Sequence, residues 1–165
     1  MKLFTKPGAC SLAPHIVLEW AGATYEARRV RFGDPDYLDI NPAGAVPTLD
    51  TGEGWTLTQA GAILAYLARR FPEARLGGDG TARGEAEIHR WSHFLTGDLH
   101  PAFFPYFVPA RYSMTTGPEA LKSTRDAALK LVRKKFDLLE SHLKGREFIV
   151  GALLAAGSEQ LDFGS

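Results

Sequence analysis

The first 75 or so residues alternate between short β-type runs and apolar positions at helical spacing. Residues 2–5 predict a short strand, which ends at the turn formers Pro7 and Gly8. Residues 25–30 predict a second strand. Between them, apolar side chains recur at helical spacing and predict a helix; these are Leu12, Ile16, Val17 and Trp20.

The pattern then predicts a β-hairpin and a further helix. Residues 45–49 predict a strand that contains Pro47, and residues 50–54 predict the turn into residues 55–57. The order βαβ, hairpin, helix is thioredoxin-like and predicts a small sheet with helices on its faces over residues 1–78. The last helix is expected to bury Ala62, Ile63, Tyr66, Leu67 and Phe71.

A glycine-rich linker at residues 76–80 is followed by purely helical periodicity, so residues 84–165 are expected to form an all-α domain. Prolines 101, 105 and 109 are expected to break or kink its first helix, and Pro118 is expected to open another. The apolar positions of the first are Ile88, Trp91, Leu95 and Leu99; those of the second are Leu121, Leu129, Val132, Phe136, Leu139 and Leu143. The predicted fold class is therefore an α/β thioredoxin-like domain followed by an all-α domain.

Composition limits the partners. The 165 residues are 45% hydrophobic and 23% charged, which is typical of a globular chain with a real core. Nineteen basic residues balance nineteen acidic ones, so nucleic acid is not an expected partner. Lys6 and Pro7 interrupt the place of a signal peptide, and no run has transmembrane length, so we expect a cytoplasmic protein that does not enter a membrane.

Cys10 is the only cysteine. Its place after a Pro-Gly loop and before a helix predicts a thiolate with a pKa below the usual value of about 8.5. The alternative is a small buried apolar side chain. Because residues 10–13 are not C-x-x-C, a dithiol cycle is excluded and monothiol chemistry remains.

Two further segments carry possible binding groups. Pro47 favours an edge position or a cis bond that turns the Val46 backbone outward for a peptide-like ligand, the alternative being an ordinary trans proline. Thr58 is expected to cap the helix that begins near Gln59 and Ala60. That helix start either binds a ligand carboxylate or is a plain cap.

The histidines offer weaker signals. His89 and His93 are one helical turn apart, but they lack a neighbouring acid or cysteine, so we expect a solvated face and no metal. His100 precedes Pro101 and is expected near a helix C-terminus, where the dipole would raise its pKa. It is either a donor facing an interdomain cleft or an ordinary helix-end histidine.

Three separated motifs together resemble the beta-class bacterial glutathione S-transferases: residues 1–15, 41–47 and 57–67, in family order. The resemblance covers residues 1–150. It implies a cytoplasmic homodimer, active in detoxification, that uses glutathione as co-substrate and transfers its thiolate to a hydrophobic electrophile. No metal is implied.

The resemblance also implies the site residues. Val46 binds the glutathione cysteinyl backbone beside a cis Pro47, and Gln59 with Ala60 holds the γ-glutamyl end. Cys10 can form a mixed disulfide with glutathione, and His100 lies beside the glutathione sulfur. The remaining residues of the implied site are His93, Gly97, Asp98 and Leu99.

Three departures from the family pattern stand out. Family members usually have Glu-Ser or Glu-Gly at positions 59–60, so one carboxylate partner for the glutathione amine is missing, at a cost of about 1–3 kcal/mol if unpaired. The basic residue that some members carry after the second strand has no clear match near residues 32–37. After residue 151 the family pattern continues with a capped helix that this sequence lacks, so we expect a truncated helical domain and hypothesise a frameshift.

The predicted function is thus a glutathione transferase. One alternative is a catalytically weak glutathione-binding or interaction protein on the same fold. Another is a monothiol glutathione-disulfide exchanger that uses Cys10.

Overall fold

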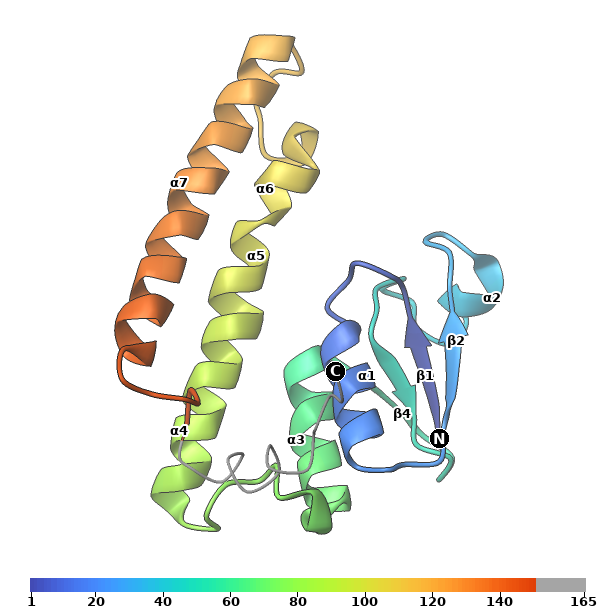
Figure 1. Cartoon of the computed structure of the whole chain (residues 1–165). Helices are drawn as coiled ribbons and strands as arrows, with labels where there is room; N and C mark the ends of the chain where they lie inside the picture. The colour runs from blue at the N-terminus through green and yellow to red at the C-terminus, as the bar shows by residue number, and fades with distance from the viewer. Residues whose placement is uncertain (151–165) are drawn as a thin grey trace, which may run out of the picture. The chain divides into compact units, whose positions relative to one another are not determined.

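The computed structural model describes residues 1–150, and the chain divides into two compact units, Met1–Gly77 and a second that begins at Gly78. The first unit holds a four-stranded sheet in the order β2-β1-β3-β4 (Figure 1). β1 pairs parallel with β2 and antiparallel with β3, and β3 pairs antiparallel with β4. The strands are β1 Lys2–Thr5, β2 Glu26–Arg29, β3 Thr48–Asp50 and β4 Thr56–Thr58.

Helices cover both faces of this sheet (Figure 1). Because successive side chains of a strand point to opposite faces, β1 buries Leu3 on one face and Phe4 on the other. Leu3 packs with side chains of α1 and α3, and Phe4 packs with Tyr37 of α2. The helices of this unit are α1 Leu12–Trp20, α2 Pro35–Leu38, α3 Ala60–Arg70 and the short 3₁₀ helix η1 Pro72–Ala74.

The buried face of α1 is not the one that its helically spaced apolar residues indicate. Leu12 is 58% exposed and Trp20 is 56% exposed, whereas Pro14 and Leu18 are buried. Ile16 is also exposed, and Val17 is only partly buried against the core. Apolar residues surround this helix on most sides, so periodicity did not distinguish the side that packs on α3 and the sheet.

The third strand and the third helix begin later than predicted. β3 begins at Thr48, directly after Pro47, whose peptide bond with Val46 is cis. Thr58 is the last residue of β4 and does not cap α3; Gln59 occupies the N-cap position without a side-chain cap hydrogen bond. The predicted apolar face of α3 is buried mainly through Ile63 and Leu67.

The second unit is helical and begins with α4 Ala82–His93, which the Thr81 side chain caps. The helical backbone then continues through a π-helical segment, η2 Phe94–Leu99, into α5 His100–Ala102. Pro101 lies within α5, and the helix ends one residue later at Ala102, with Phe103 as its C-cap. His100 therefore lies in the last turn of this helix, near its C-terminus as predicted.

The rest of the second unit follows as α6 Phe104–Phe107, the 3₁₀ helix η3 Pro109–Arg111 and α7 Pro118–Leu143. Pro118 opens α7 as predicted, and Glu119 lies in its first turn. The predicted stripe of α7 is buried at Val132 but 46% exposed at Phe136, so that part of the prediction is wrong. In residues 1–150 no helix is both long and apolar enough to cross a membrane. The predicted atypical tail and the hypothesised frameshift concern residues 151–165, outside the described residues.

Candidate functional site

The candidate site of the first unit lies along one edge of its sheet. β1 and β2 both end at this edge, and β3 begins there, with Thr48 opposite Phe4. β4 ends there, with Thr58 opposite Thr48. The segments that follow β1, precede β3 and follow β4 therefore meet. This arrangement gathers five predicted residues at one edge: Cys10, Val46, Pro47, Gln59 and Ala60.

Ser11 anchors the loop between β1 and α1. Its side chain is fully buried, and its Oγ accepts hydrogen bonds from Thr5 Oγ1 at 2.9 Å and from the Lys6 N–H at 3.1 Å. The same hydroxyl donates to the Lys6 carbonyl at 3.3 Å. A buried hydroxyl with three partners restrains the loop that carries Cys10. Sequence reasoning assigned Ser11 no role, although it directly follows the cysteine.

Cys10 is half-buried, and its Sγ donates a hydrogen bond to the Val46 carbonyl at 3.3 Å. Burial raises the pKa of the Cys10 thiol above its ordinary value, and a backbone hydrogen bond offsets only part of that rise. The predicted low-pKa thiolate is therefore wrong. Cys10 precedes the N-cap residue of α1, and its sulfur is directed to a carbonyl oxygen, which only a protonated thiol can satisfy.

The raised pKa predicts slow alkylation of Cys10 by iodoacetamide at neutral pH. The alkylation rate should reach half its maximum at a higher pH than that of N-acetylcysteine amide, a blocked cysteine without a free carboxylate, because only the thiolate reacts. Since folding favours the protonated thiol, its stabilising contribution is complete below the unfolded pKa and is lost as pH rises through the folded pKa. Cys10→Ala should lack this pH-dependent loss of stability. A half-maximal pH below that of N-acetylcysteine amide would restore the helix-dipole interpretation.

A buried polar network holds the segment before β3. Asn41 Nδ2 donates to the Ala45 carbonyl at 2.8 Å and to Thr48 Oγ1 at 3.1 Å. Tyr37 Oη donates to the same carbonyl at 2.6 Å and lies 2.9 Å from Thr48 Oγ1. Asn41, Tyr37 and Thr48 are all buried. These bonds define the backbone just before Val46. Asn41 opens the second family-like motif, and its position in an Asn-Pro turn was the signal available.

The start of α3 has an unusual backbone. Gln59 adopts φ 71° and ψ 116°, a region that non-glycine residues rarely occupy, and its side chain is exposed. Its carbonyl accepts the first helical bond, from Ile63 N–H at 3.0 Å. Ala60 is buried. Because Gln59 provides no side-chain cap, the first N–H groups of this 11-residue helix lack a capping side chain and suit a ligand carboxylate.

The other predicted site residues belong to the second unit. Gly97, Asp98 and Leu99 lie on the π-helical segment, a backbone feature frequent at functional sites. Asp98 Oδ1 accepts from Lys135 Nζ of α7 at 2.7 Å, so this carboxylate has a cationic partner. Leu99 is buried, and the His100 ring packs edge-on against Phe104 with centroids 5.0 Å apart.

His93 and His89 form an exposed pair on α4, with ring centroids 6.0 Å apart. Nowhere in residues 1–150 does a group of three or more His, Cys, Asp or Glu side chains lie together in a way that could hold a metal ion.

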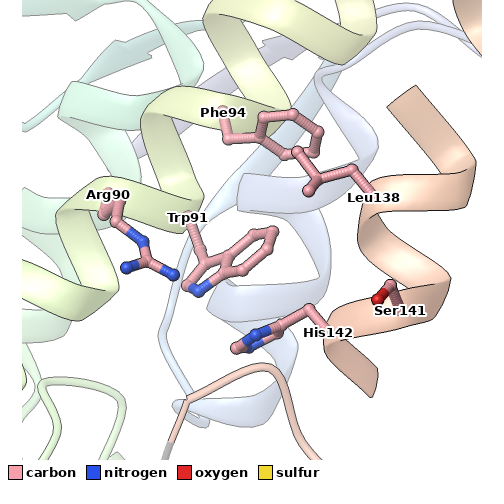
Figure 2. Close-up of a pocket in the computed structure, with 6 residues that line it drawn as sticks. All are labelled: Arg90, Trp91, Phe94, Leu138, Ser141 and His142. Carbon is pink, nitrogen blue, oxygen red and sulfur yellow. The ribbon is translucent and has the colours of Figure 1, made fainter. Parts of the chain in front are cut away.

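The second unit also has an open pocket of about 410 Å³ between α4, η2 and α7. Figure 2 shows the Trp91 and His142 rings lying one over the other, and their centroids are 4.0 Å apart. His142 Nε2 lies 2.7 Å from the Ile149 carbonyl oxygen. None of the predicted site residues lines the pocket, whose walls are Arg90, Trp91, Phe94, Leu138, Ser141 and His142.

These features define a class of protein. A βαβ unit followed by a β-hairpin and a helix, with one thiol after β1 and a cis proline before β3, forms a thioredoxin-like domain, and a helical unit follows it. Residues 1–69 match the family model described as "Glutathione S-transferase, N-terminal domain".

Comparisons extend the match to most of the chain. It is 49% identical over 156 residues to glutathione S-transferase GST-4.5 of Xanthomonas campestris pv. campestris, covering 92% of this chain and 74% of that relative. A sphingomonad glutathione S-transferase solved with glutathione is 37% identical, with a TM-score of 0.80 and coverage of 92% and 74%. The beta-class enzyme of Sphingomonas chungbukensis is 38% identical, with a TM-score of 0.79 and the same coverage. The chain belongs to the glutathione S-transferase family, which confirms the predicted family and fold class.

Proposed function

We propose that this chain binds glutathione along the sheet edge of its first unit and transfers the glutathione thiolate to hydrophobic electrophiles. The contact of Cys10 Sγ with the Val46 carbonyl carries the proposal, because it brings a thiol to the backbone that a peptide-like ligand would pair with. None of the backbone hydrogen bonds found in residues 1–150 uses the Val46 N–H, so that donor is available to the cysteinyl carbonyl of glutathione. The start of α3 would then receive the γ-glutamyl carboxylate.

The protonated state of Cys10 suits this chemistry. A neutral thiol can turn its hydrogen toward the sulfur of bound glutathione and stabilise the glutathione thiolate, whereas a Cys10 thiolate would repel it. In the transfer step the glutathione thiolate attacks the electrophilic carbon and the leaving group departs with the bonding electrons. The thiol proton of glutathione goes to solvent or to His100, which we propose lies beside the glutathione sulfur.

The remaining assignments are parts of the same proposal. Residues 1–78 would form the glutathione-binding domain and residues 84–165 the helical domain, with His93, Gly97, Asp98 and Leu99 contributing to the site. We further propose a beta-class, cytoplasmic, homodimeric protein with a role in detoxification and no metal. The 38% identity to a beta-class structure supports the class. Sedimentation equilibrium at several protein concentrations tests the dimer.

Calorimetric titration with reduced glutathione, followed by a conjugation assay with an activated aryl halide, tests the function. Saturable binding together with turnover is the expected result. Binding without turnover would favour a glutathione-binding or interaction protein on this fold, and the absence of binding would refute the proposal. Disulfide exchange is the second candidate activity, because Cys10 is partly accessible and lies at the same edge.

Gln59→Glu should strengthen glutathione binding about three- to tenfold. Position 59 would regain the carboxylate that family members usually present to the glutathione amine, and an exposed charge-assisted hydrogen bond contributes about 1 kcal/mol. Titration of both proteins at low and high salt measures the gain, which should shrink at high salt. Gln59→Ala is the matched control and should bind no better than the unsubstituted protein. Equal affinity of the Glu and Ala variants would contradict this role.

A further inference from the structure

Lys6 follows β1 directly and belongs to the same sheet edge as Cys10. Its Nζ lies 3.6 Å from the centroid of the Phe32 ring, a cation–π contact with a side chain that follows β2. The Ser11 hydroxyl holds the Lys6 backbone by two hydrogen bonds: it accepts one from the Lys6 N–H and donates one to the Lys6 carbonyl. Lys6 is therefore a restrained cation at the end of the central strand.

Within residues 1–150, Lys6 also lacks an acidic partner and forms no salt bridge. By contrast, Lys2, at the other end of β1, pairs with Glu26 at 3.3 Å. The side chain is half-buried. A half-buried cation that is held by an aromatic face and forms no salt bridge within residues 1–150 is suited to receive an anion.

The order of the strands decides which part of a ligand would reach Lys6. Across the edge the sheet runs β2-β1-β3-β4, with Gln59 after β4 and Val46 before β3. Under the proposed function, the γ-glutamyl end of glutathione lies at Gln59 and its cysteinyl residue pairs with Val46. The third residue of an extended tripeptide then points toward β1 and β2, where Lys6 lies over Phe32.

We infer that Lys6, positioned by Phe32, binds the glycyl carboxylate of glutathione. This assignment rests on the proposed function. Lys6 would supply the positive charge that some family members carry after the second strand, where this sequence has no clear match. Arg31 is the nearest competing cation in sequence, but no cation–π or salt-bridge contact of its side chain is found within residues 1–150. Lys6 therefore acts as a residue that distinguishes a free glycyl carboxylate from a neutral end.

The experiment compares glutathione with its glycyl carboxamide, which has nearly the same shape but no terminal charge. The unsubstituted protein should bind glutathione about tenfold more tightly than the amide at low salt, as expected for one partly exposed charge-assisted contact. Lys6→Met should abolish that preference, because it should weaken the binding of glutathione and leave the binding of the amide unchanged. Phe32→Leu should reduce the preference in part. Lys2→Met is the matched control on the same strand, and Arg31→Met tests the competing cation.

Each outcome decides the assignment. Equal binding of glutathione and its amide by the unsubstituted protein would overturn it, as would an equal loss for both ligands in Lys6→Met. A selective loss in Arg31→Met, with Lys6→Met unchanged, would move the contact to Arg31. Thermal unfolding of each variant separates these results from misfolding. Absence of any glutathione binding by the unsubstituted protein would instead refute the proposed function itself.

Discussion

Cys10→Ser is expected to lower the rate of glutathione-disulfide exchange at least about 100-fold, because a hydroxyl cannot form the mixed disulfide on which exchange depends. Conjugation of an aryl halide should fall much less, by under about tenfold, since a serine hydroxyl still donates a hydrogen bond. The same hydroxyl can replace the thiol as donor to the Val46 carbonyl, which Cys10 Sγ contacts at 3.3 Å. The two activities should therefore separate in one variant.

The measurement follows both reactions in the same preparation, exchange with a small mixed disulfide of glutathione and conjugation with the aryl halide. Cys10→Ala is the matched control, because it removes the hydrogen bond as well as the sulfur. It should reduce conjugation more than the serine variant does. Intact-protein mass spectrometry should detect a glutathione adduct only on the unsubstituted chain. Exchange that survives in Cys10→Ser would show that the monothiol chemistry does not use this residue.

Asn41→Ala is expected to lower the free energy of unfolding by about 2–3 kcal/mol, a large part of the stability of a domain this size. The Asn41 side chain is 6% exposed and makes three hydrogen bonds, to the Ala45 carbonyl, Thr48 Oγ1 and the Ala43 N–H. Alanine leaves the Ala43 N–H without this partner. Urea denaturation measures the change. Asp39→Ala, at an exposed position two residues away, is the control and should cost well under 1 kcal/mol.

The same substitution should raise the Kd for glutathione about tenfold at a temperature where the variant is folded. The network ends at Ala45, directly before Val46, so its loss allows the backbone that pairs with the ligand to move. Tyr37→Phe removes one of the two bonds to the Ala45 carbonyl and should give an intermediate effect. A variant with reduced stability and unchanged affinity would show that the Val46 backbone does not depend on this network.

Much of the first unit was predictable because turn formers and short β-type runs mark its elements clearly. The predicted strand over residues 2–5 matches β1. In the second unit, Pro118 opens α7 where a proline at the first helical turn predicts it. The buried face of α1 was not predictable. Its apolar residues include Leu12, Ile16, Leu18 and Trp20, and only packing against the sheet and α3 selects Leu18 for burial.

The candidate site likewise has features that the sequence predicted and features that it did not. Motif order in the sequence identified Cys10, Val46 and Gln59, because each lies in a segment that resembles the family. The ionisation of Cys10 was predicted wrongly, since a helix start in the sequence reveals neither the burial of the sulfur nor the carbonyl 36 positions away to which it donates. The hydrogen-bond partners of Ser11 and Asn41 were likewise not predictable, because they are set only once the loops fold, although the Asn-Pro turn marked the position of Asn41.

By itself, the sequence determined the kinds and order of the main elements, though not the short helix α2, as well as the family to which the chain belongs and the residues from which a site could be built. Local propensity, turn chemistry and motif order act over a few residues, so they can be read directly from the chain. Only the tertiary structure decided which face of α1 is buried, that burial raises the pKa of the Cys10 thiol and that Lys6 lies over Phe32. Burial, hydrogen bonding and cation–π contact depend on distances between segments far apart in the sequence, and folding alone sets those distances.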